Sequence, residues 1–376
     1  MHMADALLAP TVAATMYAAS TAVAGVSIHK VKNDEAMEKL PVMGVMSAFV
    51  FAGQMINYTI PGTGASGHLC GAMMLTALLG PYAGFLSMIV ILAIQCLFFA
   101  DGGLMALGAN VWNMAFYGCF VGYFLIYRPI MRSRKLKMQT KIVLASILGC
   151  VICLELGAFS VCVETTASGI TKLPFAAFTG LMLPIHLAIG LVEGVITSAV
   201  LLFVYQARPS LLECVDEAGT VEYGCNGSVA GAGLAQTGAY ADGTGMEGTA
   251  SDGAGRSGAG RSSSKLSTKG VVVILAAMAL VIGGVGSQFA SSNPDGLEWS
   301  VGGLGADDEE EAQGIAAAAS EIQEKTAFMP GYAFSSNPDS AAGTSAAGLM
   351  GACIVALAAA GICAAGGFFR KKNKMA

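Results

Sequence analysis

The chain has 376 residues, of which 55% are hydrophobic and only 12% are charged, and its mean hydropathy is +0.64. Soluble globular proteins carry about 25% charged residues, so this composition excludes a soluble domain and predicts an all-α polytopic membrane protein. The formal net charge of −5 is less informative than its distribution, because the basic residues cluster in a few short loops.

Long apolar runs alternate with short polar turns, and each run predicts a membrane-spanning helix. In chain order, the predicted spans are 8–29, 41–58, 69–80, 82–100, 109–127, 142–163, 178–205, 270–287 and 346–367. The third run is short, and we expect Gly80-Pro81 to separate it from the fourth, because proline cannot continue a helix. The runs predict a seven-span domain over residues 1–206 and a two-span hairpin over residues 270–376.

Two segments differ in composition from the apolar runs. Residues 207–269 are dominated by Gly, Ala, Ser and Thr, which predicts a flexible cytoplasmic linker between the two membrane domains. Residues 288–345 form a segment on the outer side of the membrane and include the run Asp307-Asp308-Glu309-Glu310-Glu311. We expect this run to keep the segment soluble; the alternative is that it concentrates divalent cations.

The basic clusters predict how the chain is oriented in the bilayer. Lysine and arginine are concentrated at 30–40, at 128–141 and in the C-terminal run Arg370-Lys371-Lys372-Asn373-Lys374. Such loops face the cytoplasm, so the C-terminus is expected there and the N-terminus on the outer side of a bacterial inner membrane. Counting the spans back puts the 59–68 loop on the outer side as well. His2 and His68 are therefore expected on the same side.

The first two residues, Met1-His2, offer a compact set of nitrogen ligands. A metal bound by the terminal amine, the amide nitrogen of residue 2 and the His2 imidazole would close a five-membered and a six-membered chelate ring. These nitrogens are nearly coplanar, and a fourth in the same plane, for which His68 is the candidate, completes a square. Square-planar nitrogen sites favour Ni(II) or Cu(II) over Zn(II). The alternative is an ordinary initiator Met followed by His.

The sequence lacks the motifs that mark several other functions. The sequence contains no P-loop, no nucleophile elbow and no HExxH, so we expect neither an enzyme nor ATP hydrolysis by this chain itself. The basic tail follows a membrane span and is a topology signal, so no nucleic-acid partner is expected. The ten cysteines show no metal-ligand spacing and lie mostly in apolar runs, where Cys behaves as a small hydrophobic residue. No resident cofactor is expected.

Polar side chains in or beside the spans are candidates for supporting a metal site, because such groups are costly in a membrane and tend to be functional. For the carboxylates the alternative is hydrogen bonding between helices, and for the histidine it is capping of a helix start. The asparagine could hydrogen-bond a ligand or orient a histidine. The candidates are Asp5, Ser66, Asn110, His186 and Glu193.

Several stretches resemble one known family, the membrane-embedded substrate-binding subunits of nickel and cobalt energy-coupling-factor (ECF) transporters. The C-terminal part resembles the small N component of the same systems, which suggests a fusion of the two. The resemblance covers residues 1–205 and about 270–367. The matching stretches are residues 1–10 (Met1-His2-Met3-Ala4-Asp5-Ala6-Leu7-Leu8-Ala9-Pro10), Ser66-Gly67-His68-Leu69, Leu79-Gly80-Pro81, Leu107-Gly108-Ala109-Asn110-Val111, residues 186–194 (His186-Leu187-Ala188-Ile189-Gly190-Leu191-Val192-Glu193-Gly194) and Pro294-Asp295-Gly296-Leu297-Glu298.

The resemblance implies a seven-helix substrate subunit that holds a metal through the amine of Met1, the amide and imidazole of His2, and His68. It also implies partners: a transmembrane coupling subunit (T component) and ABC-type ATPase subunits, in a lipid bilayer. Met3-Ala4-Asp5 and Ser66-Gly67-His68 are closer to the nickel branch, so Ni(II) is the expected cargo. The alternatives are Co(II) in the same machine, a stand-alone secondary transporter, and a metal-sensing receptor.

Overall fold

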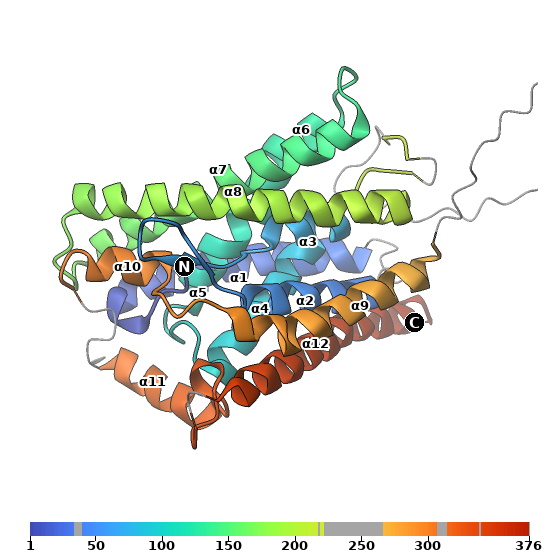
Figure 1. The fold of residues 1–376 in the computed structure, drawn as a ribbon. Coiled ribbons are helices and arrows are strands. Elements are labelled where there is room, and N and C mark those ends of the chain that lie inside the picture. Colours follow the sequence, from blue (N-terminus) through green and yellow to red (C-terminus); the bar gives the residue numbers. More distant parts are fainter. Residues whose placement is uncertain (34–39, 217–218, 222–265, 307–313, 338–339, 376) are drawn as a thin grey trace, which may run out of the picture.

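The structure is a computed structural model that describes residues 1–33, 40–216, 219–221, 266–306, 314–337 and 340–375. Most of the predicted linker and the acidic run at 307–311 lie outside the described residues. The bundle is built from long helices that run side by side, with the shorter helices α10 and α11 at one end (Figure 1).

The described chain is mainly helical. Its helices are η1 (Asp5–Leu7), α1 (Pro10–Asn33), α2 (Leu40–Gln54), α3 (Ala72–Leu79), α4 (Pro81–Phe99), α5 (Leu107–Val111), the π-helical η3 (Trp112–Tyr127), α6 (Arg128–Met131), α7 (Met138–Ser168), α8 (Phe175–Ala207), η4 (Pro209–Leu211), α9 (Thr268–Gly284), η5 (Gly286–Phe289), α10 (Gly296–Gly302), α11 (Ile315–Thr326), η6 (Pro330–Tyr332) and α12 (Ala341–Met375). Two short strands, β1 (Tyr58–Thr59) and β2 (Ser66–Gly67), pair antiparallel with Tyr58 opposite Gly67.

Six helical segments are long and apolar enough to cross a bilayer, among the residues that the structure describes. They confirm a polytopic all-α membrane protein. The spans are Pro10–Val31, Pro81–Phe99, Leu107–Met131, Met138–Ser168, Phe175–Ala207 and Ala341–Gly361, and the apolar helices Val42–Gln54 and Thr268–Gly284 are shorter.

The predicted third span differs from expectation. The helix there, α3, has 8 residues, and at about 1.5 Å per residue it is too short to cross a hydrocarbon core of about 30 Å. Two glycines with positive φ limit it: Gly71, in the left-handed αL conformation with φ of 81°, and Gly80, with φ of 82°. Pro81 then begins α4 directly, so the predicted break between the two helices is confirmed.

Residues 266–375, which we call the C-terminal region, pack their two long helices against each other and against α2 (Figure 1). Small residues permit the close approach. A Cβ on Gly348 of α12 would meet the carbonyl oxygen of Gly283 in α9, and a Cβ on Gly44 of α2 would lie 2.9 Å from the carbonyl oxygen of Ala356. The C-terminal region is therefore part of the helical bundle.

One end of the bundle gathers segments that are far apart in sequence. The N-terminus, α10 and the turn after α4 lie there, with α11 beside them (Figure 1). The C-terminus of α12 lies at the opposite end. The start of the predicted linker is packed rather than free, because Leu211, Leu212 and Glu213 are buried and the Glu213 amide donates to Ala77 O at 2.7 Å.

Candidate metal centre

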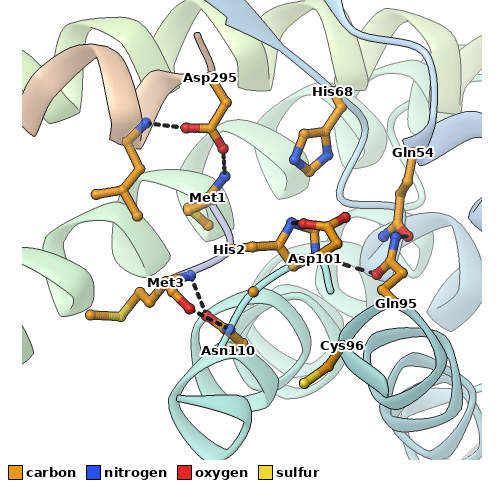
Figure 2. A network of polar contacts seen from close by, with 12 residues as sticks. Met1, His2, Met3, Gln54, His68, Gln95, Cys96, Asp101, Asn110 and Asp295 are labelled. Atoms are coloured by element: carbon orange, nitrogen blue, oxygen red, sulfur yellow. Dashed lines mark hydrogen bonds and ion pairs between the residues drawn. The ribbon is translucent and has the colours of Figure 1, made fainter. Parts of the chain in front are cut away.

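The N-terminal residues thread into the bundle and are fixed there by Asn110. The exposed fraction is 5% for Met1 and 0% for Met3. The side chain of Asn110, from α5, accepts a hydrogen bond from Met3 N at 2.7 Å and donates one to Met3 O at 3.2 Å (Figure 2). The Gly103 amide also donates to Met3 O, at 2.9 Å. Because the main chain of Met3 is fixed in this way, Met1 and His2 are held in the bundle.

Asp5 ties the N-terminal segment to the turn at residues 103–106. Its carboxylate accepts a hydrogen bond from Ala106 N at 2.9 Å. Burial raises the pKa of Asp5, although the hydrogen bond from Ala106 acts in the opposite sense. A Cβ on Gly103 would collide with the Asp5 carboxyl, so only glycine fits there. Asp5 thus fixes the N-terminal segment to the 103–106 turn.

His2 lies between two polar groups from the end of α4. Its Nδ1 is 3.2 Å from Oδ1 of Asp101, and its Nε2 is 3.3 Å from Oε1 of Gln95 (Figure 2). Gln95 is held in turn by Gln54 of α2, through a hydrogen bond of 2.9 Å. Burial lowers the pKa of His2, although the charge of Asp101 acts in the opposite sense. Burial therefore favours the neutral form of the His2 imidazole, which is the form that binds a metal.

His68 follows β2 and faces His2. The two ring centroids are 5.3 Å apart, and the rings are inclined by 22°. Nδ1 of His68 is 2.9 Å from Leu69 O; a carbonyl only accepts, so this nitrogen carries the proton and Nε2 keeps its lone pair. Burial lowers the pKa of His68 to about 4. This tautomer presents Nε2 as a ligand atom.

Glu193 of α8 fixes the loop that carries His68. Its two carboxylate oxygens accept hydrogen bonds from the amides of Cys70, at 2.8 Å, and Gly71, at 2.9 Å. Both amides follow His68 within three residues. Glu193 is 1% exposed, so these bonds are made out of water and orient the loop strongly.

The amine of Met1 pairs with a residue from the far end of the sequence. Its nitrogen is 2.5 Å from Oδ2 of Asp295, just before α10 (Figure 2). Burial acts to raise the pKa of Asp295, but the charge of the amine and the hydrogen bond that it donates outweigh burial, and the pKa lies below its ordinary value. The Ser66 amide donates to Pro294 O at 2.8 Å, which joins this segment to β2.

His186 borders the site from α8. Its Nδ1 donates to Met182 O at 2.8 Å, while its buried Nε2 has no hydrogen-bond partner in the described part of the chain. It lines a small cavity together with Met1, His68 and Asp295. The expected helix start does not lie here, because α8 begins 11 positions earlier, at Phe175.

The donor set restricts what the site can bind. In the described ranges, no group of three or more His, Cys, Asp or Glu side chains could hold a metal ion. A metal here would have to use main-chain nitrogens beside the two imidazoles. The Met1 amine, His2 and His68 lie together (Figure 2), and a ligand set of nitrogens alone suits Ni(II) or Cu(II) better than a hard cation.

The sequence-based search missed three polar groups at the site. Asp101, Gln95 and Asp295 all contact Met1 or His2. Gln95 and Asp101 carried a signal, because each is a polar residue within or directly after an apolar run. Asp295 lay within a recognised motif, but nothing local indicates that a residue 294 positions away contacts the chain start.

Fold and site together define a multi-pass membrane protein with a buried nitrogen-rich centre at one end of its helices. The sequence matches the family described as "Cobalt uptake substrate-specific transmembrane region" over residues 2–211, and the "PDGLE domain" over residues 269–366. The chain therefore belongs to this cobalt uptake family. It is a component of nickel or cobalt transport rather than an enzyme.

Individual relatives differ in the metal that they are named for. A "Putative fused nickel transport protein NikMN" of Archaeoglobus fulgidus is 38% identical over 217 residues, which is 57% of this chain and 68% of the relative. A "Cobalt transport protein CbiM" of Sorangium cellulosum is 28% identical over 215 residues, which is 57% of this chain and 95% of the relative. The chain in a crystal structure of a transition metal transporter is 35% identical, with a TM-score of 0.48. The match covers 54% of this chain and 92% of the chain in that structure.

Proposed function

We propose that this protein binds Ni(II) and carries it across the membrane as the substrate-specific subunit of an ATP-driven ECF importer. The ligands are the amine of Met1, the amide nitrogen and Nδ1 of His2, and Nε2 of His68. The observation that carries the proposal is the stacking of the two imidazoles, with centroids 5.3 Å apart, beside the buried chain start. The neutral state of both rings supports it, because only a neutral imidazole donates to a metal.

Support from surrounding residues is part of the proposal. Asn110 holds the main chain of Met3, and Glu193 holds the loop behind His68. Asp5 and Ser66 fix the segments on either side of the site. His186 lines the same small cavity as Met1 and His68, so it would border a metal held there. Groups of this kind orient metal ligands and tune their affinity.

The choice of nickel over cobalt rests on geometry. Four coplanar nitrogens favour Ni(II), whereas Co(II) more readily takes octahedral or tetrahedral coordination. Calorimetric titration and X-ray absorption on the purified protein decide between them. Tighter binding of six-coordinate Co(II) than of Ni(II) would make cobalt the cargo.

The same proposal specifies the domains of this subunit, its partner subunits and its orientation in the membrane. Residues 1–206 form the seven-helix substrate domain, 207–269 the linker, and 270–376 the hairpin. A T component and ABC-type ATPases are the partners, with the N-terminus outside and the C-terminus in the cytoplasm of a bacterial cell. The second candidate is a stand-alone secondary transporter. Uptake of labelled nickel that persists after deletion of the ATPase genes would favour this second candidate.

Extension of the N-terminus tests the coordination directly. One residue added before Met1 moves the amine away from the amide with which it would chelate, so we expect nickel binding to be lost. His2→Ala and His68→Ala should lose it too. His29→Ala, on α1 and away from the centre, is the matched control and should bind normally. Metal analysis of the purified variants checks this, and full nickel content in the extended protein contradicts the ligand set.

A further inference from the structure

His186 presents a ring nitrogen without a partner. Its Nδ1 donates a hydrogen bond to the carbonyl of Met182, one turn earlier in α8, at 2.8 Å. Nδ1 therefore carries the proton, and Nε2 keeps its lone pair and is directed away from the backbone of α8. His186 is 1% exposed, and Nε2 is buried with no hydrogen-bond partner among the residues that the structure describes. A buried lone pair with no donor is costly to keep, which points to a ligand that uses it.

A small cavity connects His186 to the proposed metal ligands. Met1 and His68 line this cavity together with His186, and it has room for about one water molecule, hence also for a cation without its hydration shell. Gly296, the first residue of α10, closes the cavity on one side, because a Cβ there would lie 3.0 Å from Cε1 of His186. A cation that left the centre through this cavity would meet the imidazole of His186.

A second cavity continues from the first into the bundle. The two cavities share four lining residues, Met1 and Cys70 among them, so they lie next to each other. The second is also lined by Glu193, about two turns or about 10 Å further along α8 than His186. Its lining includes three cysteines beside this carboxylate. His186 therefore lies between the metal centre and a deeper set of groups that can bind a transition metal.

His186 and the loop of His68 are carried by the same helix. Glu193 of α8 accepts two hydrogen bonds from the main chain just after His68. His2, by contrast, is hydrogen-bonded to a side chain of α4. His68 and His186 thus form a pair of imidazoles fixed to α8, whereas the other imidazole of the centre is held elsewhere.

We propose that Nε2 of His186 takes over the cation when it leaves the four-nitrogen centre for the second cavity, so that His186 is a transfer ligand in transport. This inference rests on the proposed coordination by Met1, His2 and His68. In the loaded centre the amine, the amide and two imidazoles fill the square, so His186 is not needed for binding at equilibrium. Once the cation leaves the square, His68 and His186 bind it together. Imidazole suits a transition-metal cation such as Ni(II).

Two substitutions separate the lone pair of His186 from its hydrogen bond to Met182. In His186→Gln the side-chain amide still donates to Met182 O, but its carbonyl oxygen suits hard cations better than nickel. In His186→Met the hydrogen bond is lost, but the thioether offers a lone pair to the cation. We expect His186→Gln to lower the rate of labelled-nickel uptake on the order of tenfold, and His186→Met to keep more uptake than His186→Gln.

Equilibrium binding should not follow uptake. His186 makes no hydrogen bond to a proposed ligand in the described part of the chain. Calorimetric titration of the purified His186→Gln protein should therefore give a nickel affinity within about threefold of the original. X-ray absorption should show the same four nitrogens around nickel in both proteins. His29→Gln, at an exposed histidine of α1, is the matched control and should change neither uptake nor binding.

The outcomes separate the two proposals. Normal uptake by His186→Gln would overturn the transfer role, as would uptake that His186→Gln keeps and His186→Met loses, because the hydrogen bond to Met182 would then be the function of His186. A nickel affinity that falls as far as uptake would overturn it too and make His186 a positioning residue. In each of these cases loss of binding in His2→Ala leaves the coordination standing. Full binding by His2→Ala would refute the coordination itself.

Discussion

At the scale of single residues, the centre combines a terminal amine with two of the four imidazoles of the chain. His2 is hydrogen-bonded to Gln95 of α4, His68 to the carbonyl of Leu69, and Met1 to Asp295 just before α10. Asn110 has the most direct effect on geometry, because its side-chain amide bonds both the amide nitrogen and the carbonyl oxygen of Met3, the residue after His2. These two hydrogen bonds set the direction in which Met1-His2 enters the helical bundle.

Asn110→Ala removes both hydrogen bonds to Met3. The dipeptide then has more freedom, and we expect nickel affinity to fall by about tenfold to a hundredfold, the usual effect of losing a group that orients a ligand. Competition against a chelator of known affinity measures the change. Thr15→Ala is the control, because the Thr15 hydroxyl donates to the Thr11 carbonyl of its own helix on an exposed face. An affinity within twofold of the original would contradict the role of Asn110.

His68 predicts how stability depends on pH without metal. Its pKa is about 4 in the folded protein and about 6.5 in the unfolded chain, so between these values the unfolded state binds more protons. Stability therefore falls as the pH drops through this window. His68→Gln removes this titration, and its melting temperature in detergent should fall less between about pH 7 and about pH 5. An equal fall in both proteins would show that His68 does not contribute.

At the scale of elements, the C-terminal region reaches the site because α9 and α12 pack tightly on each other and on α2. Glycine makes this packing possible where helix backbones nearly touch. In α12, Gly348 faces the backbone of α9, whereas Gly361 of the same helix has nothing within 4 Å of an added Cβ. The two glycines therefore offer a matched pair of substitutions.

Gly348→Val should force α9 and α12 apart and destabilise the protein by roughly 1–3 kcal/mol, the usual cost of overpacking. Gly361→Val adds the same atoms in open space and should leave stability nearly unchanged. Thermal unfolding in detergent measures both. Equal melting temperatures for the two variants would mean that the close contact between the helices is not made.

Sequence reasoning found the elements better than their contacts. Apolar runs and Gly80-Pro81 predicted the main spans, because hydrophobicity and proline act locally. The length of α3 was overestimated, since the left-handed conformation at Gly71 cannot be read from an apolar run. The chain start and His68 were singled out by their chemistry. The roles of Asp101 and Asp295 were not, because they arise only when distant segments fold together.

At the scale of the whole molecule, the arrangement of charge predicts orientation. Leu136 lies in the exposed basic loop between α6 and α7, and Ser335 is exposed in the segment that follows η6. With the exposed Cys353 changed to Ser, Leu136→Cys should react with a membrane-impermeant maleimide only after the cells are permeabilised. Ser335→Cys should react in intact cells, and the parent protein gives the background. The reverse pattern would invert the topology.

The anchoring of the His68 loop on α8 has a mechanical consequence. Glu193 accepts hydrogen bonds from the amides of Cys70 and Gly71, and a Cβ on Gly67 would lie 2.5 Å from Ile189. The loop is therefore packed tightly against α8. His2, by contrast, is bonded to side chains at the end of α4. If α8 tilts relative to α4, one imidazole travels with each helix. Such a tilt would separate the two imidazole rings and release a metal ion held between them.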